Sequence, residues 1–179
     1  QATIVRDGFG LILTVDTSIQ QFVREALVKR YKAYNAESAV AVVMEPRTGA
    51  ILSLVSLPDF EPVNIGSASA GNLKNRVLTD PYEPGSIFKP IVAAIALDTG
   101  VVNPNEKIFC EYGNYRGKGF GRIGEYGTHE FGNLTVKEIL VHSSNIGMAK
   151  IGQRMERKSF HEGLKLFGFG SKSGIDLPG

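Results

Sequence analysis

Ser86 and Lys89 are three residues apart in the run Tyr82–Pro90, at the expected start of a helix. Residues at this spacing share one helix face, with Cβ atoms about 5–6 Å apart. A serine hydroxyl is a weak nucleophile until a base takes its proton, and a lysine can be that base only as a neutral amine. Burial or a neighbouring cation would have to lower its pKa from about 10.4. The pair therefore fits a serine nucleophile with a lysine base, and it also fits a helix N-cap followed by a solvated lysine.

A second polar group, Ser143-Ser144-Asn145, lies between two expected helices. In an interhelical turn, the Ser143 hydroxyl and the Asn145 carboxamide can point into one cleft. The hydroxyl could relay a proton there, and the amide could hold a substrate amide or position a lysine amine. Ordinary turn chemistry also explains the same residues, because Ser and Asn favour caps and turns.

The elements that would position these groups begin near the N-terminus. Gly10–Val15 reads as a short strand. Thr17 with Gln20 predicts a capping box, and apolar residues at helical spacing continue the helix to about Tyr34.

Two β-rich runs, Ser38–Met44 and Ala50–Leu57, are joined by a short Pro- and Gly-containing segment, which predicts an antiparallel hairpin. Because both runs are apolar at nearly every position, we expect strands covered on both faces. A short helix is expected within Ala68–Val77. The next helix is Ser86–Leu97, in which Pro90 must lie near the first turn because it has no N–H to donate.

The stretch Val101–Gly132 is rich in glycine and lacks periodicity, so we expect a long loop there. Thr135 with Glu138 then starts a helix that ends near Val141. Two further helices are expected, at Asn145–Arg157 and Ser159–Phe167.

Composition excludes several classes of protein. The 179 residues are 42% hydrophobic and 21% charged, as in one globular domain. The net charge of +2 argues against a domain that binds nucleic acid or acidic lipid through its positive charge. A single cysteine, Cys110, excludes a disulfide framework and a zinc finger. The longest apolar runs, Ala39–Met44 and Ile91–Leu97, are far short of the roughly twenty residues of a membrane span. The start at Gln1 indicates a processed or engineered piece, with any targeting segment lying outside it.

Other motifs carry weaker signals. Gly119–Gly124 fits Gly-x-Gly-x-x-Gly without the flanking strand and helix that a dinucleotide site needs. The run Tyr115–Tyr126 is basic and aromatic, but glutamates in and near it reduce its positive charge. We therefore expect a loop at the rim of a cleft and no nucleic-acid site. His129 and His142 are expected to be structural, and Cys110 a bystander without a nearby base.

The motifs together resemble one family. Tyr82–Pro90 is very similar to the active-site signature of penicillin-binding protein transpeptidases, and Leu140–Gly147 resembles the second motif of that family. The similarity runs from about Leu11 to the last residue and is strongest to the monofunctional, class B type. Further segments that resemble the family are Ala41–Val55, Pro58–Pro62, Phe167–Gly170 and Gly174–Gly179.

The resemblance implies an α/β fold of the serine β-lactamase and transpeptidase type, a mostly antiparallel sheet flanked by helices. Residues 1–179 would form a partial domain, with strand, helix and first hairpin in 10–57 and a mostly helical part in 58–179. The third motif of the family, Lys-Thr-Gly or Lys-Ser-Gly, belongs on a later strand. We therefore interpret Lys172-Ser173-Gly174 as a loop, and expect the final strands to be absent and this segment alone to be inactive.

The implied function is peptidoglycan D,D-transpeptidation through a serine acyl-enzyme, with stem peptides ending in D-Ala-D-Ala as substrates and β-lactams as ligands. Ser86 would be the nucleophile and Lys89 its base. Ser143 would pass the proton to the leaving amine, and Asn145 would orient Lys89 and the substrate amide. The resemblance implies no metal or organic cofactor, and it implies an N-terminal anchor on the outer face of the bacterial cytoplasmic membrane, with cell-wall synthesis partners. Two alternatives stay open: a β-lactamase or β-lactam sensor of the same fold, and a catalytically inactive scaffold.

Overall fold

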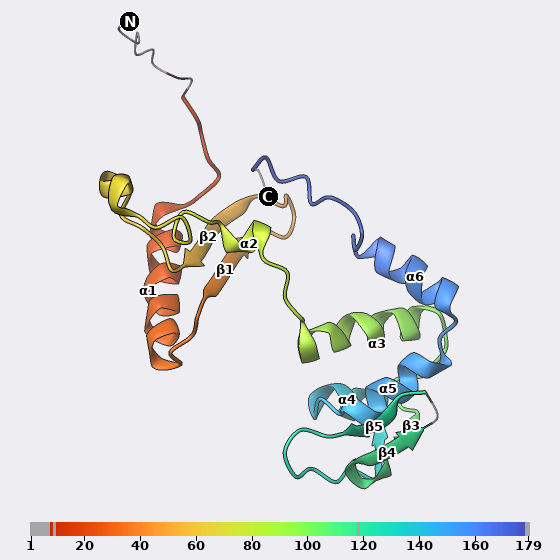
Figure 1. The fold of residues 1–179 in the computed structure, drawn as a ribbon. Coiled ribbons are helices and arrows are strands. Elements are labelled where there is room, and N and C mark those ends of the chain that lie inside the picture. The colour runs from red at the N-terminus through yellow and green to blue at the C-terminus, as the bar shows by residue number, and fades with distance from the viewer. Residues whose placement is uncertain (1–7, 9, 118, 178–179) are drawn as a thin grey trace, which may run out of the picture. The chain divides into compact units, whose positions relative to one another are not determined.

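The computed structural model describes residues 8, 10–117 and 119–177 and contains two compact units (Figure 1). The first unit extends to Pro81 and includes Leu177, and the second is Tyr82–Asp176. Helices alternate with short antiparallel strands, which confirms the expected fold class. All four candidate residues of the two sequence motifs lie in the second unit. In the part of the chain that the structure describes, no helix has the length and apolar character to cross a membrane.

The first unit is a helix packed on a hairpin. Helix α1 (Thr17–Ala33) contacts strands β1 (Ala39–Met44) and β2 (Ile51–Leu57). The two strands pair antiparallel, from Ala39 opposite Leu57 to Met44 opposite Ile51, so the predicted hairpin is confirmed.

The start of α1 differs from the prediction. Asp16, and not Thr17, is the N-cap, because its carboxylate accepts the N–H groups of Ser18 and Ile19. Gln20 is turned to β2, where its Oε1 accepts the Leu54 N–H at 2.8 Å. The predicted capping box is therefore wrong, since a tertiary partner takes the Gln20 side chain.

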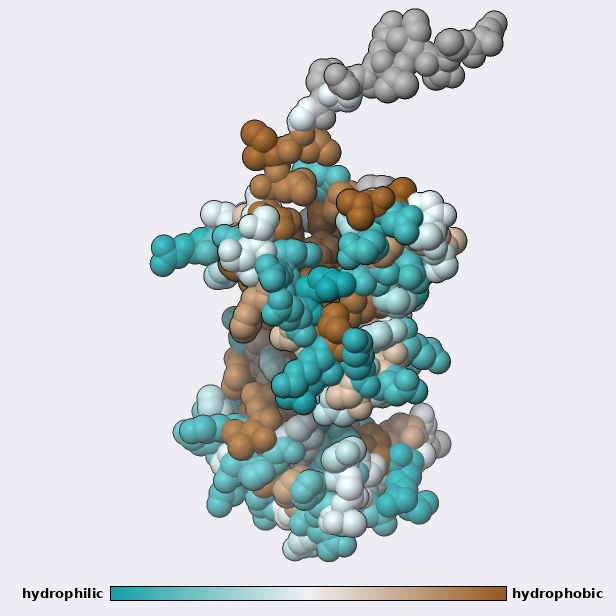
Figure 2. All heavy atoms as spheres, turned by 90° about the vertical axis from the view of Figure 1, so that its left-hand side faces the viewer, coloured by the Kyte–Doolittle hydropathy of each residue, from teal (hydrophilic) through white to brown (hydrophobic). Residues whose placement is uncertain are grey.

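Two further expectations for this unit are wrong. Residues 10–15 form no strand, because only Thr14 and Asp16 bond to β2 and two isolated contacts make no ladder. Strand β1 alternates between half-buried and exposed positions and leaves Val40, Val42 and Met44 exposed, so the expectation of strands covered on both faces is wrong for β1. Every position of β2 is buried or half-buried, so the expectation holds there. Figure 2 shows apolar side chains among hydrophilic ones on one face of the molecule.

The first unit also contains two short turns of helix after β2. These are η1 (Pro62–Ser67) and α2 (Arg76–Thr79), where one helix within Ala68–Val77 was expected.

The second unit is organised around α3 (Lys89–Asp98), which a 3₁₀ turn, η2 (Gly85–Phe88), precedes. Pro90 lies in the first turn of α3, as predicted, where a missing N–H costs nothing. Val92, Ala93 and Ala96 of α3 join a core with α4 (Val136–Val141) and α5 (Asn145–Arg154). Helix α6 (Arg157–Leu166) contacts α3.

The expected long loop is largely structured. It contains β3 (Lys107–Phe109), η3 (Glu111–Gly113), β4 (Asn114–Gly117) and β5 (Gly121–Gly124). Strand β4 pairs with β5, and β3 pairs with β6 (Asn133–Thr135). Strands of three or four residues are too short to show a period, which is why the sequence predicted a loop. The segment that fits Gly-x-Gly-x-x-Gly is part of the β4–β5 hairpin, and no helix begins directly after it.

The next helix start is as predicted. Thr135 accepts the Glu138 N–H, and the Glu138 carboxylate accepts the Thr135 N–H, which confirms the capping box of α4. Helix α5 begins at Asn145, also as predicted, and both α5 and α6 end slightly earlier than expected.

Two glycines of α5 provide a matched test of this packing. A Cβ on Gly147 would lie 2.6 Å from Cγ1 of the fully buried Ile139, whereas a Cβ on Gly152 would meet nothing within 4 Å. We expect Gly147→Ala to destabilise the protein by about 1–3 kcal/mol through overpacking. Gly152→Ala should stabilise it by about 0.5–1 kcal/mol through helix propensity. Urea denaturation measures both changes, and equal midpoints for the two variants would contradict the close approach of α5 to α4.

Candidate active site

Ser86 lies in the 3₁₀ turn that leads into α3, and Lys89 is the first residue of that helix. Gly85 has a φ of +57°, a left-handed conformation that residues with a Cβ rarely adopt. This turn leaves the Ser86 side chain exposed, whereas Lys89 is half-buried.

The second motif forms the turn between α4 and α5. The Ser144 N–H donates to Ile139 O at 2.9 Å and the Ser143 N–H donates to Leu140 O at 3.2 Å. This pair of bonds is a Schellman ending, in which the left-handed residue is usually glycine. Here that residue is Ser143, with a φ of 54°, which costs about 1–3 kcal/mol. The position therefore bears a side chain at the expense of backbone strain.

The Lys89 amine joins α3 to this turn. Its Nζ lies 2.5 Å from Ser143 O, 3.0 Å from Ser143 Oγ and 2.6 Å from Asn145 Oδ1. Asn145 is oriented by its other end, since Nδ2 donates to Gly124 O at 2.9 Å. The carboxamide oxygen is thereby directed at the amine.

Ser86 opens on the same cleft as Ser143 and Asn145, which has a volume of about 220 Å³. The structure thus brings all four candidate residues to one place. Phe131 stands between two imidazoles, with ring centroids 5.4 Å from those of both His129 and His142. The remaining residues that line the cleft are Glu125, Tyr126, His129, Phe131 and His142.

Burial lowers the pKa of Lys89 from its ordinary value of 10.5, and the charge of Glu125 acts in the opposite direction. A lowered pKa increases the fraction of neutral amine, the form that can accept a proton. Burial also raises the pKa of the Cys110 thiol, whose Sγ lies 3.6 Å from Ser144 Oγ, so this thiol is held in its protonated form.

Glu125 is the site residue that sequence reasoning missed. It follows β5 directly, and its carboxylate accepts hydrogen bonds from Ser144, Asn145 and Ile146. The only sequence signal is a carboxylate at the end of a glycine-rich segment. No spacing rule connects such a position to a turn much later in the chain.

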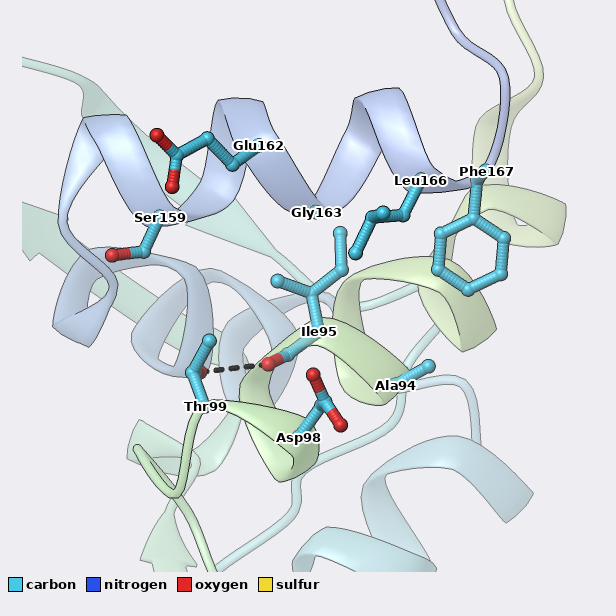
Figure 3. Close-up of a pocket in the computed structure, with 9 residues that line it drawn as sticks. All are labelled: Ala94, Ile95, Asp98, Thr99, Ser159, Glu162, Gly163, Leu166 and Phe167. Carbon is cyan, nitrogen blue, oxygen red and sulfur yellow. Dashed lines mark hydrogen bonds between the residues drawn. The ribbon is translucent and has the colours of Figure 1, made fainter.

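A larger cavity of about 540 Å³ lies between α3 and α6, where Ile95 faces Gly163 (Figure 3). Its walls are mainly apolar, with the carboxylates of Asp98 and Glu162. The lining residues that the structure describes include Ser159 but no amine or imidazole beside it. The smaller cleft is the candidate active site because a hydroxyl, an amine and a carboxamide converge there.

Among the described residues, no group of three or more His, Cys, Asp or Glu side chains is arranged to hold a metal ion. Lys172-Ser173-Gly174 lies in irregular chain after α6 and outside any strand, as expected.

The lowered pKa of Lys89 leads to a test on stability. Between its folded pKa and the unfolded value of 10.5, the folded state binds fewer protons at Lys89 than the unfolded chain does. Stability therefore rises with pH across that window. From about pH 7 to about pH 10 we expect the free energy of unfolding of the unmodified protein to rise relative to that of Lys89→Met. Chemical denaturation at several pH values measures this difference, and a constant or falling difference would be incompatible with a depressed pKa.

Comparison with known proteins gives a consistent result. Residues 39–179 match the model of the penicillin binding protein transpeptidase domain. Stage V sporulation protein D of Bacillus subtilis is 35% identical over 176 residues, which are 97% of this chain and 27% of that protein. The probable peptidoglycan D,D-transpeptidase PenA of Neisseria meningitidis is 33% identical over 174 residues, 97% of this chain and 29% of PenA.

Solved structures agree. The transpeptidase domain of penicillin-binding protein 3 from Burkholderia pseudomallei superposes with a TM-score of 0.80 and 32% identity, covering 97% of this chain and 47% of that one. A peptidoglycan glycosyltransferase from Burkholderia ambifaria also gives a TM-score of 0.80, at 32% identity, over 93% of this chain and 48% of the other. The chain thus spans less than a third of these curated relatives and about half of the solved chains. With the family model matched over residues 39–179, the chain belongs to the penicillin-binding protein transpeptidases, of class B.

Proposed function

We propose that the protein is a serine D,D-transpeptidase that cross-links peptidoglycan stem peptides and is acylated by β-lactams. The observation that carries the proposal is the position of Lys89 Nζ, within 3.0 Å of Ser143 Oγ and Asn145 Oδ1 beside the cleft that Ser86 lines. Family membership and relatives named as D,D-transpeptidases support the substrate class.

In the proposed acylation, Ser86 Oγ attacks the penultimate D-Ala carbonyl while Lys89 takes the hydroxyl proton. The tetrahedral oxyanion is stabilised by backbone N–H groups, among them that of Ser86. As the peptide C–N bond breaks, Ser143 gives its proton to the leaving D-alanine amine and receives one from Lys89. The products are an ester on Ser86, free D-alanine and a neutral Lys89.

The hydrogen bonds of Lys89 support this assignment of roles. Ser143 O and Asn145 Oδ1 can only accept, so they hold two N–H groups in either protonation state. A protonated amine places its third N–H on Ser143 Oγ, the group that donates next. A neutral amine has two N–H groups and one lone pair, and the lone pair can take a proton.

The second half of the reaction uses the same groups. The amine of another stem peptide attacks the ester, Lys89 removes its proton, and Ser86 Oγ leaves and is reprotonated. A β-lactam follows the first half alone, because its ring nitrogen remains attached to the acyl group after the C–N bond breaks. The ester then persists on Ser86.

We further propose that the protein works on the extracytoplasmic face of the bacterial cytoplasmic membrane, held by an N-terminal anchor. There it would meet stem peptides and the other proteins of cell-wall synthesis. The membership of the family, whose relatives act on peptidoglycan by name, supports this placement.

The nucleophile is tested by labelling with a fluorescent penicillin. The protein at its full natural length should be labelled at Ser86, and Ser86→Ala should abolish the label because the proposed mechanism forms the acyl-enzyme on the Ser86 hydroxyl. Ser171→Ala, at another exposed serine, is the matched control and should retain labelling. Gel fluorescence with peptide mapping measures the outcome, and a label that survives Ser86→Ala would refute the assignment.

The rate of deacylation separates the proposal from a β-lactamase. A transpeptidase should open about one equivalent of penicillin per active serine in a burst, retain it as the ester, and then stall. Steady hydrolysis beyond that burst would favour a β-lactamase, and a protein that forms no acyl-enzyme would favour an inactive scaffold. Absorbance of a chromogenic β-lactam at a known enzyme concentration distinguishes the three.

A further inference from the structure

Glu125 lies at the end of β5, where its carboxylate meets the N-terminus of α5. Oε2 accepts the Asn145 N–H at 2.6 Å. Oε1 accepts the Ser144 hydroxyl at 2.6 Å and the Ile146 N–H at 3.3 Å. One carboxylate therefore binds three consecutive residues of the second motif and the helix that follows it.

These bonds satisfy a specific need of α5. The first N–H groups of a helix have no partner within the helix, and negative charge is favoured at that end. The N-cap Ser144 accepts the Gly147 N–H at 2.9 Å, and Glu125 accepts the two N–H groups before it. Charge-assisted bonds of this kind are stronger than those of a neutral cap.

The residue before Glu125 completes the arrangement. Gly124 O accepts Asn145 Nδ2 at 2.9 Å, so adjacent residues hold both the backbone and the side chain of Asn145. The free end of the carboxamide, Oδ1, then lies 2.6 Å from Lys89 Nζ. A shift of Glu125 would therefore displace a direct partner of the amine.

Glu125 also acts on Lys89 through its charge. Burial lowers the pKa of Lys89, and the Glu125 carboxylate raises it. The other titratable groups around the cleft are the side chains of Tyr126, His129 and His142, with the Cys110 thiol behind Ser144.

We propose that Glu125 is a positioning residue of the acylation reaction, one that holds the Ser143–Asn145 turn against Lys89 and supplies the negative charge on that side of the cleft. The inference rests on the proposed function for its kinetic consequences, and on the contacts above for its structural ones. Nothing requires Glu125 to touch substrate.

The decisive variant is Glu125→Gln, which removes the charge and keeps the size. Only neutral Lys89 can take the Ser86 proton, so the acylation rate falls at pH values below the Lys89 pKa. Because the Glu125 charge raises that pKa, its loss should move this acid limb of the pH–rate profile to lower pH. The plateau rate should also fall, by about tenfold to a hundredfold, because the turn is held less firmly. Stopped-flow acylation by a β-lactam, with the protein at its full natural length, measures both. Glu130→Gln, an exposed charge in the same segment, is the control and should leave both unchanged.

Glu125→Asp separates the two contributions. It keeps the charge but shortens the reach to the Asn145 N–H, so we expect a lower plateau and a smaller change in the acid limb than in Glu125→Gln. A residue that only caps α5 would change the plateau and leave the limb in place. An acid limb that is identical in Glu125→Gln and Glu130→Gln would therefore overturn the proposal, as would an unchanged plateau in Glu125→Asp.

A measurement without any substrate distinguishes this proposal from the proposed function. The pKa of Lys89, followed by NMR of lysine labelled with ¹³C at Cε, should fall in Glu125→Gln and stay in Glu130→Gln. An unchanged Lys89 pKa would refute the role of Glu125 even if Ser86 is acylated. If the Lys89 pKa falls in Glu125→Gln but the protein is never acylated, the action of Glu125 on Lys89 is upheld. The transpeptidase assignment is then the proposal that fails.

Discussion

The hydrogen bonds of one half-buried amine connect the two sequence motifs. Lys89 Nζ reaches from the start of α3 to Ser143 and Asn145, residues that lie more than fifty positions later in the chain. A lysine removed from water needs acceptors, because an unsatisfied buried charge is costly. The packing of α3 against α5 brings those acceptors within reach, and the small residues Ala93 and Ala96 of α3 are buried in the core that the two helices share. The core thus fixes the distance over which the chemistry operates.

Backbone strain contributes to the same arrangement. A left-handed residue stands next to the nucleophile at Gly85 and another carries the proposed relay hydroxyl at Ser143. Glycine adopts this conformation without a steric penalty, but serine does not. At Ser143 the strained backbone points both the carbonyl and the hydroxyl at Lys89 Nζ. A glycine there would relieve the strain and would leave the amine without the one partner that can also donate a proton.

The local part of this architecture could be predicted from the sequence. Thr135 and Glu138 form their capping box because both partners lie within one helical turn, and Pro90 marks the start of α3 for a similarly local reason. Non-local pairing could not be predicted. The Gln20 side chain accepts a hydrogen bond from Leu54 of β2 and does not cap α1. Strand β3 pairs with β6, and the residues between these strands are most of the expected loop. Such contacts depend on which segments meet in space.

The same distinction explains why the sequence revealed four candidate residues and not the groups that hold them. Ser86, Lys89, Ser143 and Asn145 are recognisable because the proposed chemistry requires each side chain. Gly124 orients Asn145 through a backbone carbonyl, which any residue could supply, so this support leaves no mark on the sequence. A support of this kind becomes visible only when coordinates show which segment lies beside the turn. In this protein that segment is the β4–β5 hairpin, the part of the second unit for which sequence patterns were least informative.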